Sequence, residues 1–94
     1  MKEISEKILI AEDDQNLIEC IHDLLKSIEP DFEIDCAENG TEAVKKTTEK
    51  DYGIILGDFD MPETNGIEFF LLLKEKRFKG KFYLMSGQAL DRKK

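Results

Sequence analysis

The sequence predicts an α/β domain in which a doubly wound parallel sheet carries helices on both faces. Short apolar runs rich in branched side chains alternate along the chain with segments whose apolar residues recur at helical spacing. Strict alternation of this kind favours parallel strands joined by right-handed crossovers. With 94 residues and 40% apolar content, the chain is long enough for one domain, which we take as residues 1–94.

The first predicted strand covers residues 7–11, Lys-Ile-Leu-Ile-Ala, an apolar run that suits burial on both faces. A helix follows, with apolar residues at helical spacing from Leu17 to Ile28, and Pro30 closes it. We expect Asp14 or Asn16 to cap its first turn.

Residues 32–37 alternate apolar and polar side chains, which is typical of an edge strand. A turn over residues 38–40 leads to a short helix that ends near Glu49, with Thr41 as its predicted N-cap.

The third strand is predicted from Tyr52 to Leu56 or Gly57, and a loop over residues 58–65 follows it. Gly57 either loosens this strand or marks the close approach of another part of the backbone. The next helix, Gly66 to about Arg77, has a wide apolar face and should be well buried. Residues 81–85 form the fourth predicted strand.

Carboxylates and a hydroxyl follow three of these strands. Glu12 and Asp13 follow the first, Asp58 and Asp60 the third, and Ser86 the fourth. Because ligands of such sheets bind outside the carboxyl ends of the strands, we expect these groups to share one crevice. Any single loop acid is more often a solvated turn residue, but acids that converge from several strand ends need a cation between them. Hard oxygen ligands suit Mg²⁺, and the pattern predicts phosphoryl transfer to a carboxylate.

Three segments carry a family resemblance. Residues 8–14 (Ile-Leu-Ile-Ala-Glu-Asp-Asp), 58–66 (Asp-Phe-Asp-Met-Pro, then Asn-Gly) and 84–87 (Leu-Met-Ser-Gly) resemble the receiver domain of two-component response regulators. The resemblance covers nearly the whole chain and implies the flavodoxin-like receiver fold. It also implies a signalling domain that accepts a phosphoryl group from a histidine kinase or phosphotransfer protein, with at most slow self-dephosphorylation and no true enzymatic activity.

The resemblance also implies a role for each site residue. Asp58 would be the phosphoacceptor and a metal ligand, and Ser86 would be the switch hydroxyl that moves to the phosphoryl group. Asp13 would bind Mg²⁺ directly and Glu12 through water, while Asp60 would contribute its backbone carbonyl.

The chain ends at Lys94, before the fifth strand and its phosphoryl-binding lysine that the family pattern contains. We therefore expect a C-terminally truncated receiver that lacks the last strand and helix, with strand order 2-1-3-4 and slow phosphorylation. The exposed edge of the fourth strand could then pair with a second copy, giving a homodimer, or with a partner.

Composition excludes several classes of function. The net charge of −7 argues against nucleic acid or an anionic membrane as partners of this domain. No long apolar run or signal peptide occurs, which predicts a cytoplasmic protein. Cys20 and Cys36 lack metal-site spacing and are expected to be buried thiols. The charge is uneven: residues 1–65 carry 18 acids and 6 bases, whereas residues 66–94 carry 3 acids and 8 bases.

Two other functions remain open. A degenerate receiver would keep the fold and act as a phosphorylation-independent interaction module. The spacing of Asp58 and Asp60 also resembles the nucleophile motif of haloacid-dehalogenase-type phosphatases, but Met61 and Pro62 depart from that motif.

Overall fold

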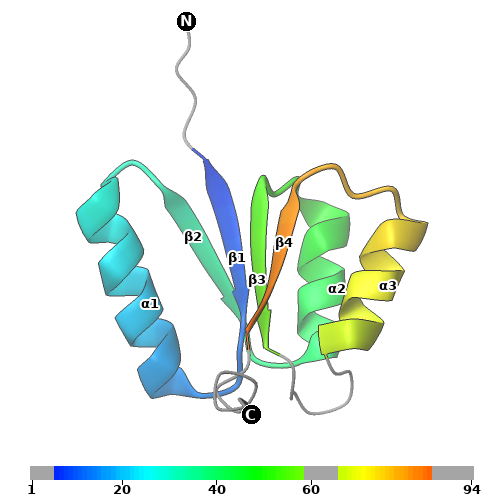
Figure 1. Cartoon of the computed structure of the whole chain (residues 1–94), viewed down its shortest axis with the longest axis horizontal. Helices are drawn as coiled ribbons and strands as arrows, with labels where there is room; N and C mark the ends of the chain where they lie inside the picture. Colours follow the sequence, from blue (N-terminus) through cyan, green and yellow to red (C-terminus); the bar gives the residue numbers. More distant parts are fainter. Residues whose placement is uncertain (1–5, 59–65, 86–94) are drawn as a thin grey trace, which may run out of the picture.

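All four strands of the described chain lie parallel in one sheet of order β2-β1-β3-β4, as predicted (Figure 1). The computed structural model describes residues 6–58 and 66–85. Strands and helices alternate in the order β1 (Lys7–Ala11), α1 (Gln15–Ile28), β2 (Glu33–Ala37), α2 (Gly40–Glu49), β3 (Ile54–Asp58), α3 (Gly66–Glu75) and β4 (Lys81–Met85). The doubly wound parallel sheet is therefore confirmed.

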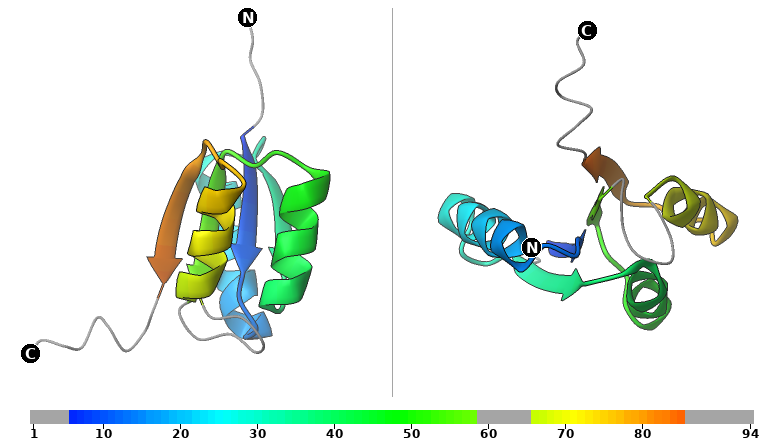
Figure 2. Two further views of the ribbon diagram at one scale, coloured as in Figure 1. Left: turned by 90° about the vertical axis from the view of Figure 1, so that its right-hand side faces the viewer. Right: turned by 90° about the horizontal axis from the view of Figure 1, so that it is seen from below.

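The helices cover both faces of the sheet. Helix α1 lies on one face, and α2 and α3 lie side by side on the other (Figures 1 and 2). Successive residues of β1 point to opposite faces: Ile8 and Ile10 pack with Ile18 of α1, while Leu9 packs with Phe69 of α3. Strand β1 is buried on both faces, which explains its uninterrupted apolar run.

The starts of α1 and α2 are set by side-chain caps. The Asp14 carboxylate accepts hydrogen bonds from the backbone N–H groups of Asn16 and Leu17, at 2.9 and 3.4 Å. For α2 the prediction was wrong, because Asn39 and not Thr41 is the N-cap. The Asn39 side chain accepts from the Glu42 N–H at 2.8 Å, since the helix begins two residues earlier than a cap at Thr41 predicts.

Helix α3 is less buried than its sequence predicts. Phe69 and Leu73, four residues apart, are its buried apolar side chains in the core, whereas Ile67 and Leu71 are 44% and 56% exposed. A helix that packs on one face of a sheet buries only the side chains that point toward the sheet. When its apolar face is wider than that, some of its apolar side chains remain exposed to solvent. The prediction for Cys20 was also wrong, because it is exposed on α1.

Strand β4 occupies one edge of the sheet. Among the described residues it pairs only with β3, in a register that places Gly57 beside Leu84 and Leu56 beside Tyr83. Tyr83 and Leu84 are both about half exposed. The other edge is β2, as its alternating pattern predicts.

A polar contact that the sequence does not reveal anchors the segment before β3. Tyr52 is buried outside the strand, and its hydroxyl donates to Asp35 of β2 at 2.6 Å. Lys50 donates to the same carboxylate oxygen at 2.9 Å. Partial burial alone would raise the pKa of Asp35, but the hydrogen bonds from Tyr52 and Lys50 outweigh it and hold the pKa below its usual value.

Candidate functional site at the carboxyl edge of the sheet

Glu12 continues β1 by one residue toward the carboxyl edge of the sheet. Its backbone N–H donates to the carbonyl of Ala37 at 2.9 Å, so the pairing with β2 extends beyond Ala11. The Glu12 side chain is only 3% exposed at this position. Its carboxylate accepts a hydrogen bond of 3.1 Å from the Asp14 N–H.

Three carboxylates converge at this edge, as the strand ends predict. Glu12, Asp13 and Asp58 each offer an oxygen, and these oxygens all lie within 4.8 Å of one another. Glu12 is buried, Asp13 is exposed, and Asp58 at the end of β3 is half-buried. The group is therefore open to solvent on one side and enclosed on the other.

This crowding has an electrostatic cost that falls on Glu12. The pKa of Glu12 is raised from 4.5 to about 7: burial is the largest cause, the charges of Asp58 and Asp13 add to it, and the hydrogen bond from the Asp14 N–H partly opposes it. A cation among the three oxygens would remove that repulsion. Hard carboxylate oxygens with an open side are the ligands that Mg²⁺ takes, so the residues present fit this ion.

The residue before Asp58 is a glycine because an aromatic ring occupies the adjacent space. A Cβ atom on Gly57 would lie 2.8 Å from Cζ of Phe82, closer than carbon atoms pack. The Phe82 ring contacts Phe69 edge to face, with centroids 5.7 Å apart, and tilts against Phe70 at 5.2 Å. The predicted close approach of another backbone segment was wrong, because the group that lies against Gly57 is the side chain of Phe82 from β4.

The predicted site is assembled in part by the described residues. Glu12, Asp13 and Asp58 lie together, and Asp14 caps α1 beside them. Asp60 and Ser86 lie outside the described residues. Sequence reasoning missed the role of Phe82, and the signal that could have found it is the unexpected glycine in the neighbouring strand.

Similarity to known proteins agrees with this arrangement. The chain matches the family model for the response regulator receiver domain over residues 8–93. The transcriptional regulatory protein ResD of Bacillus subtilis is 38% identical over 71 residues, which are 76% of this chain and 29% of ResD. The chain thus spans less than a third of that relative.

Two solved structures extend the comparison. The response regulator TrrA of Thermotoga maritima, in complex with Mg²⁺-BeF, superposes with a TM-score of 0.83 at 31% identity, covering 93% of this chain and 74% of TrrA. The complex of the histidine kinase ThkA with TrrA matches with a TM-score of 0.82 at 30% identity, covering 95% of this chain and 75% of the matched one.

Proposed function

Because the chain belongs to the receiver-domain family of response regulators, we propose that it accepts a phosphoryl group on Asp58, with Mg²⁺ bound at the acidic edge. The observation that carries the proposal is the convergence of Glu12, Asp13 and Asp58 within 4.8 Å at the carboxyl ends of β1 and β3. The domain would act in two-component or phosphorelay signalling as a phosphoacceptor with at most slow self-dephosphorylation, and not as a turnover enzyme.

Asp58 is the proposed nucleophile. One of its carboxylate oxygens forms the new bond to phosphorus while the bond between phosphorus and the donor's nitrogen or oxygen breaks. Its half-buried position at the end of β3 leaves it open to a donor from the solvent side. Glu12 and Asp13 would hold Mg²⁺, which when bound neutralises charge on the transferring group.

Two further roles come from the family resemblance. Ser86 is proposed as the switch hydroxyl that contacts the phosphoryl group, and the backbone carbonyl of Asp60 as a further metal ligand. Both residues lie outside the described part of the chain, so they rest on their sequence positions after β4 and β3.

The proposed donor is a histidine kinase or a phosphotransfer protein, in line with the solved complex of TrrA with the kinase ThkA. We place this step in the cytoplasm. The net charge of −7 opposes nucleic acid or an anionic membrane as a partner of this domain. No helix among the described residues is long and apolar enough to cross a membrane.

The free side of β4 is a second proposed contact. In the described residues this strand has a neighbour on one side only, and Tyr83 and Leu84 leave apolar surface around it. Unpaired strand edges readily accept another strand. A strand from a partner protein, or from a second copy of the chain in a homodimer, would supply hydrogen-bond partners for this side of β4.

Intact-protein mass spectrometry after incubation with acetyl phosphate and Mg²⁺ tests the proposal. We expect one added phosphoryl group on the wild type, none on Asp58→Asn, and one on the control Asp31→Asn, which removes an exposed acid before β2. A folded wild-type chain that stays unmodified would favour the phosphorylation-independent interaction module, and a modified Asp58→Asn would refute the assignment of the acceptor.

A further inference from the structure

Strand β4 presents a backbone edge with a definite pattern of hydrogen-bonding groups. Within residues 6–58 and 66–85 it pairs with β3 alone. The Lys81 N–H donates to the Gly53 carbonyl at 2.8 Å, so the backbone groups of Lys81 point toward β3. Because these groups alternate in direction along a strand, those of Phe82 and Leu84 point away from β3. Each of these two residues offers one N–H and one C=O on the outer side of β4.

Apolar side chains flank this edge on both faces of the sheet. On the side of α3, Phe82 and Leu84 line a hollow of about 280 Å³ together with Ile67 and Phe70. On the side of α1, Tyr83 is 51% exposed beside its register partner in β3. A second β-strand on the outer side of β4 would cover these side chains as well as the backbone groups.

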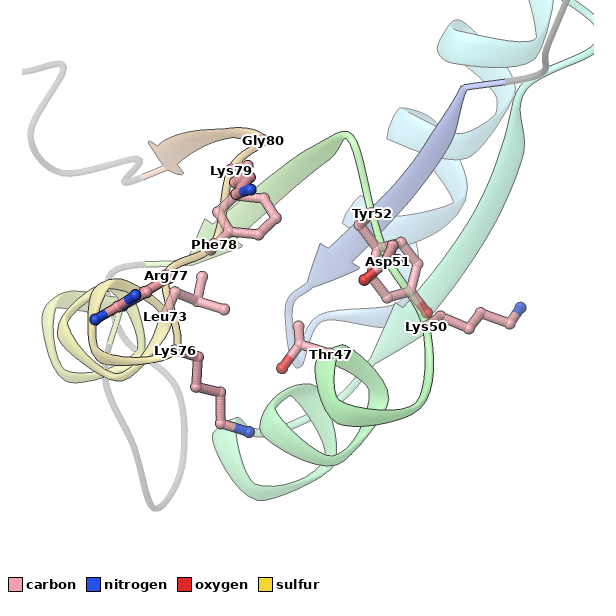
Figure 3. Close-up of a pocket in the computed structure, with 10 residues that line it drawn as sticks. All are labelled: Thr47, Lys50, Asp51, Tyr52, Leu73, Lys76, Arg77, Phe78, Lys79 and Gly80. Carbon is pink, nitrogen blue, oxygen red and sulfur yellow. The ribbon is translucent and has the colours of Figure 1, made fainter.

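The two ends of β4 differ in charge, which selects the direction of such a strand. The segment between α3 and β4 carries the exposed Lys76 and Lys79 (Figure 3), and Lys81 begins the strand. The other end lies at the acidic edge, where Met85 pairs with Asp58. An antiparallel copy of β4 would place the basic end of one chain beside the acidic edge of the other. A parallel copy would place like charges together, which is unfavourable.

One antiparallel register uses every outward group of the described strand. With Tyr83 opposite the partner's Tyr83, Phe82 lies opposite the partner's Leu84, and each such pair exchanges two backbone hydrogen bonds. The side chains of Phe82 and the partner's Leu84 then share the face that carries the apolar hollow. The two tyrosines form a close pair on the other face, an arrangement that stabilises antiparallel strands when the side chains are aromatic.

The same register brings a cation to the acidic edge. Met85 pairs with Asp58 of β3 and would lie opposite the partner's Lys81. These three residues share the face of the sheet on which α1 lies, because Leu56, two positions before Asp58, belongs to the cluster with Ile18. The Cα atoms of Asp58 and the partner's Lys81 would be two strand spacings apart, about 9.6 Å. Extended lysine and aspartate side chains can bridge that distance.

We propose that two copies of the chain pair through antiparallel β4 strands, and that Lys81 of each copy lies against the acidic edge of the other. There its ammonium adds positive charge beside Asp58 as the phosphoryl group arrives. The role of Lys81 rests on the proposed function of Asp58, whereas the pairing of the strands does not. The paired edge is short, so the dimer should dissociate on dilution.

Cysteine cross-linking tests the pairing, in a chain whose two native cysteines are replaced by Cys20→Ser and Cys36→Ser. Tyr83→Cys places two thiols on facing residues whose Cα atoms are about 4.5 Å apart, within the range of a disulfide. We expect diamide to convert this variant to a covalent dimer at high chain concentration. The matched control Lys81→Cys should stay monomeric, because each thiol lies opposite the partner's Met85. Equal cross-linking of Lys81→Cys, or none of Tyr83→Cys, would overturn the pairing.

Mixing of variants tests the role of Lys81. At a concentration at which the dimer forms, Lys81→Ala should slow phosphorylation by acetyl phosphate and Mg²⁺ at least about tenfold. The control Lys79→Ala, an exposed cation outside the paired strand, should change the rate less than about twofold. An excess of Asp58→Asn chains, which keep Lys81, should restore most of the rate to Lys81→Ala. Chains that carry both Asp58→Asn and Lys81→Ala should not restore it.

Two results would overturn the assignment of Lys81: no rescue by the Asp58→Asn chains, or an equal slowing in Lys79→Ala. If no chain is phosphorylated at all, the proposed function of Asp58 fails, and the cross-linking of Tyr83→Cys still decides whether the strands pair.

Discussion

Glu12 is a buried carboxylate with oxygens of two more carboxylates, Asp13 and Asp58, within 4.8 Å. Burying a carboxylate raises the free energy of its charged form, and like charges raise it further. A side chain in this position lowers the stability of the ligand-free fold at neutral pH. Its presence makes physical sense if a cation binds beside it.

The first prediction concerns Glu12→Gln. The folded-state pKa of Glu12, about 7, is above its ordinary value of 4.5, so between these values the folded chain holds a proton that the unfolded chain has lost. Stability therefore falls as the pH rises through this window. Glu12→Gln removes the effect, and at pH 8 in EDTA it should raise the free energy of unfolding by about 3 kcal/mol.

Urea denaturation of the two proteins at a series of pH values checks this expectation. The free energies of unfolding of the wild type and the variant should converge below pH 4.5, the ordinary pKa of Glu12, where its carboxyl is neutral in both the folded and the unfolded chain. A variant that is less stable than the wild type at pH 8 would contradict the electrostatic cost assigned to Glu12.

Gly57 carries the second prediction. In Gly57→Ala the new methyl group would meet Phe82, whose ring is held between Phe69 and Phe70. Overpacking should outweigh the gain from replacing a strand glycine and reduce stability by about 1 kcal/mol. When Phe82 is replaced by Leu, Gly57→Ala should reduce the stability by less, because the ring that it meets is gone. Thermal unfolding of the wild type, the two single variants and the double variant measures how far the two substitutions affect each other's stability change. Additive stability changes would argue against the contact between Phe82 and the residue at position 57.

At the scale of elements, helix α2 shows how a local signal can be misassigned. Asn39 and Thr41 are both residue types that cap helices, and they lie two positions apart. The structure selects Asn39, because β2 ends at Ala37 and the chain must turn at once. The choice depends on where the strand ends, which sequence patterns locate only to within a few residues.

The third prediction separates the two candidates for the cap. Asn39→Ala removes the acceptor of the Glu42 N–H and should reduce the free energy of unfolding by about 1 kcal/mol. Thr41→Ala should reduce it by clearly less. Chemical denaturation of both variants decides between them, and a larger loss in Thr41→Ala would restore the assignment made from the sequence.

Helix α3 illustrates a different limit of sequence reasoning. Its apolar residues span most of its circumference, so periodicity alone cannot say which of them face the sheet. The packing partners decide: Phe69 lies against Phe82 of β4, and Leu73 belongs to the core cluster that includes Ile55. Tyr52 is a similar case, because its partner Asp35 lies 17 positions away in the sequence.

At the scale of the whole molecule, the sequence predicts the order of the strands and the position of the acidic edge better than it predicts the cap of α2 or the buried face of α3. Alternation of strand and helix, with acids after the first and third strands, is a pattern with few topological solutions. The paired register of β1 with β3 then brings Glu12 and Asp58 to the same edge. What could not be predicted are contacts that depend on side-chain shape, such as Phe82 in the space beside Gly57.

The two ends of the sheet also differ in charge. The carboxyl edge gathers Glu12, Asp13 and Asp58, whereas the segment between α3 and β4 at the opposite end carries the exposed Lys76 and Lys79. Helices α2 and α3 run between these ends and contact each other (Figure 1).

The measurement that tests the central claim most directly is the location of the phosphoryl group within the chain. After incubation with acetyl phosphate and Mg²⁺, borohydride reduces an aspartyl phosphate to homoserine, which tandem mass spectrometry places at one residue. We predict homoserine at position 58 alone, and none when Mg²⁺ is replaced by EDTA. Homoserine at another aspartate, or its absence from a folded chain in Mg²⁺, would contradict the claim that Asp58 is the phosphoacceptor.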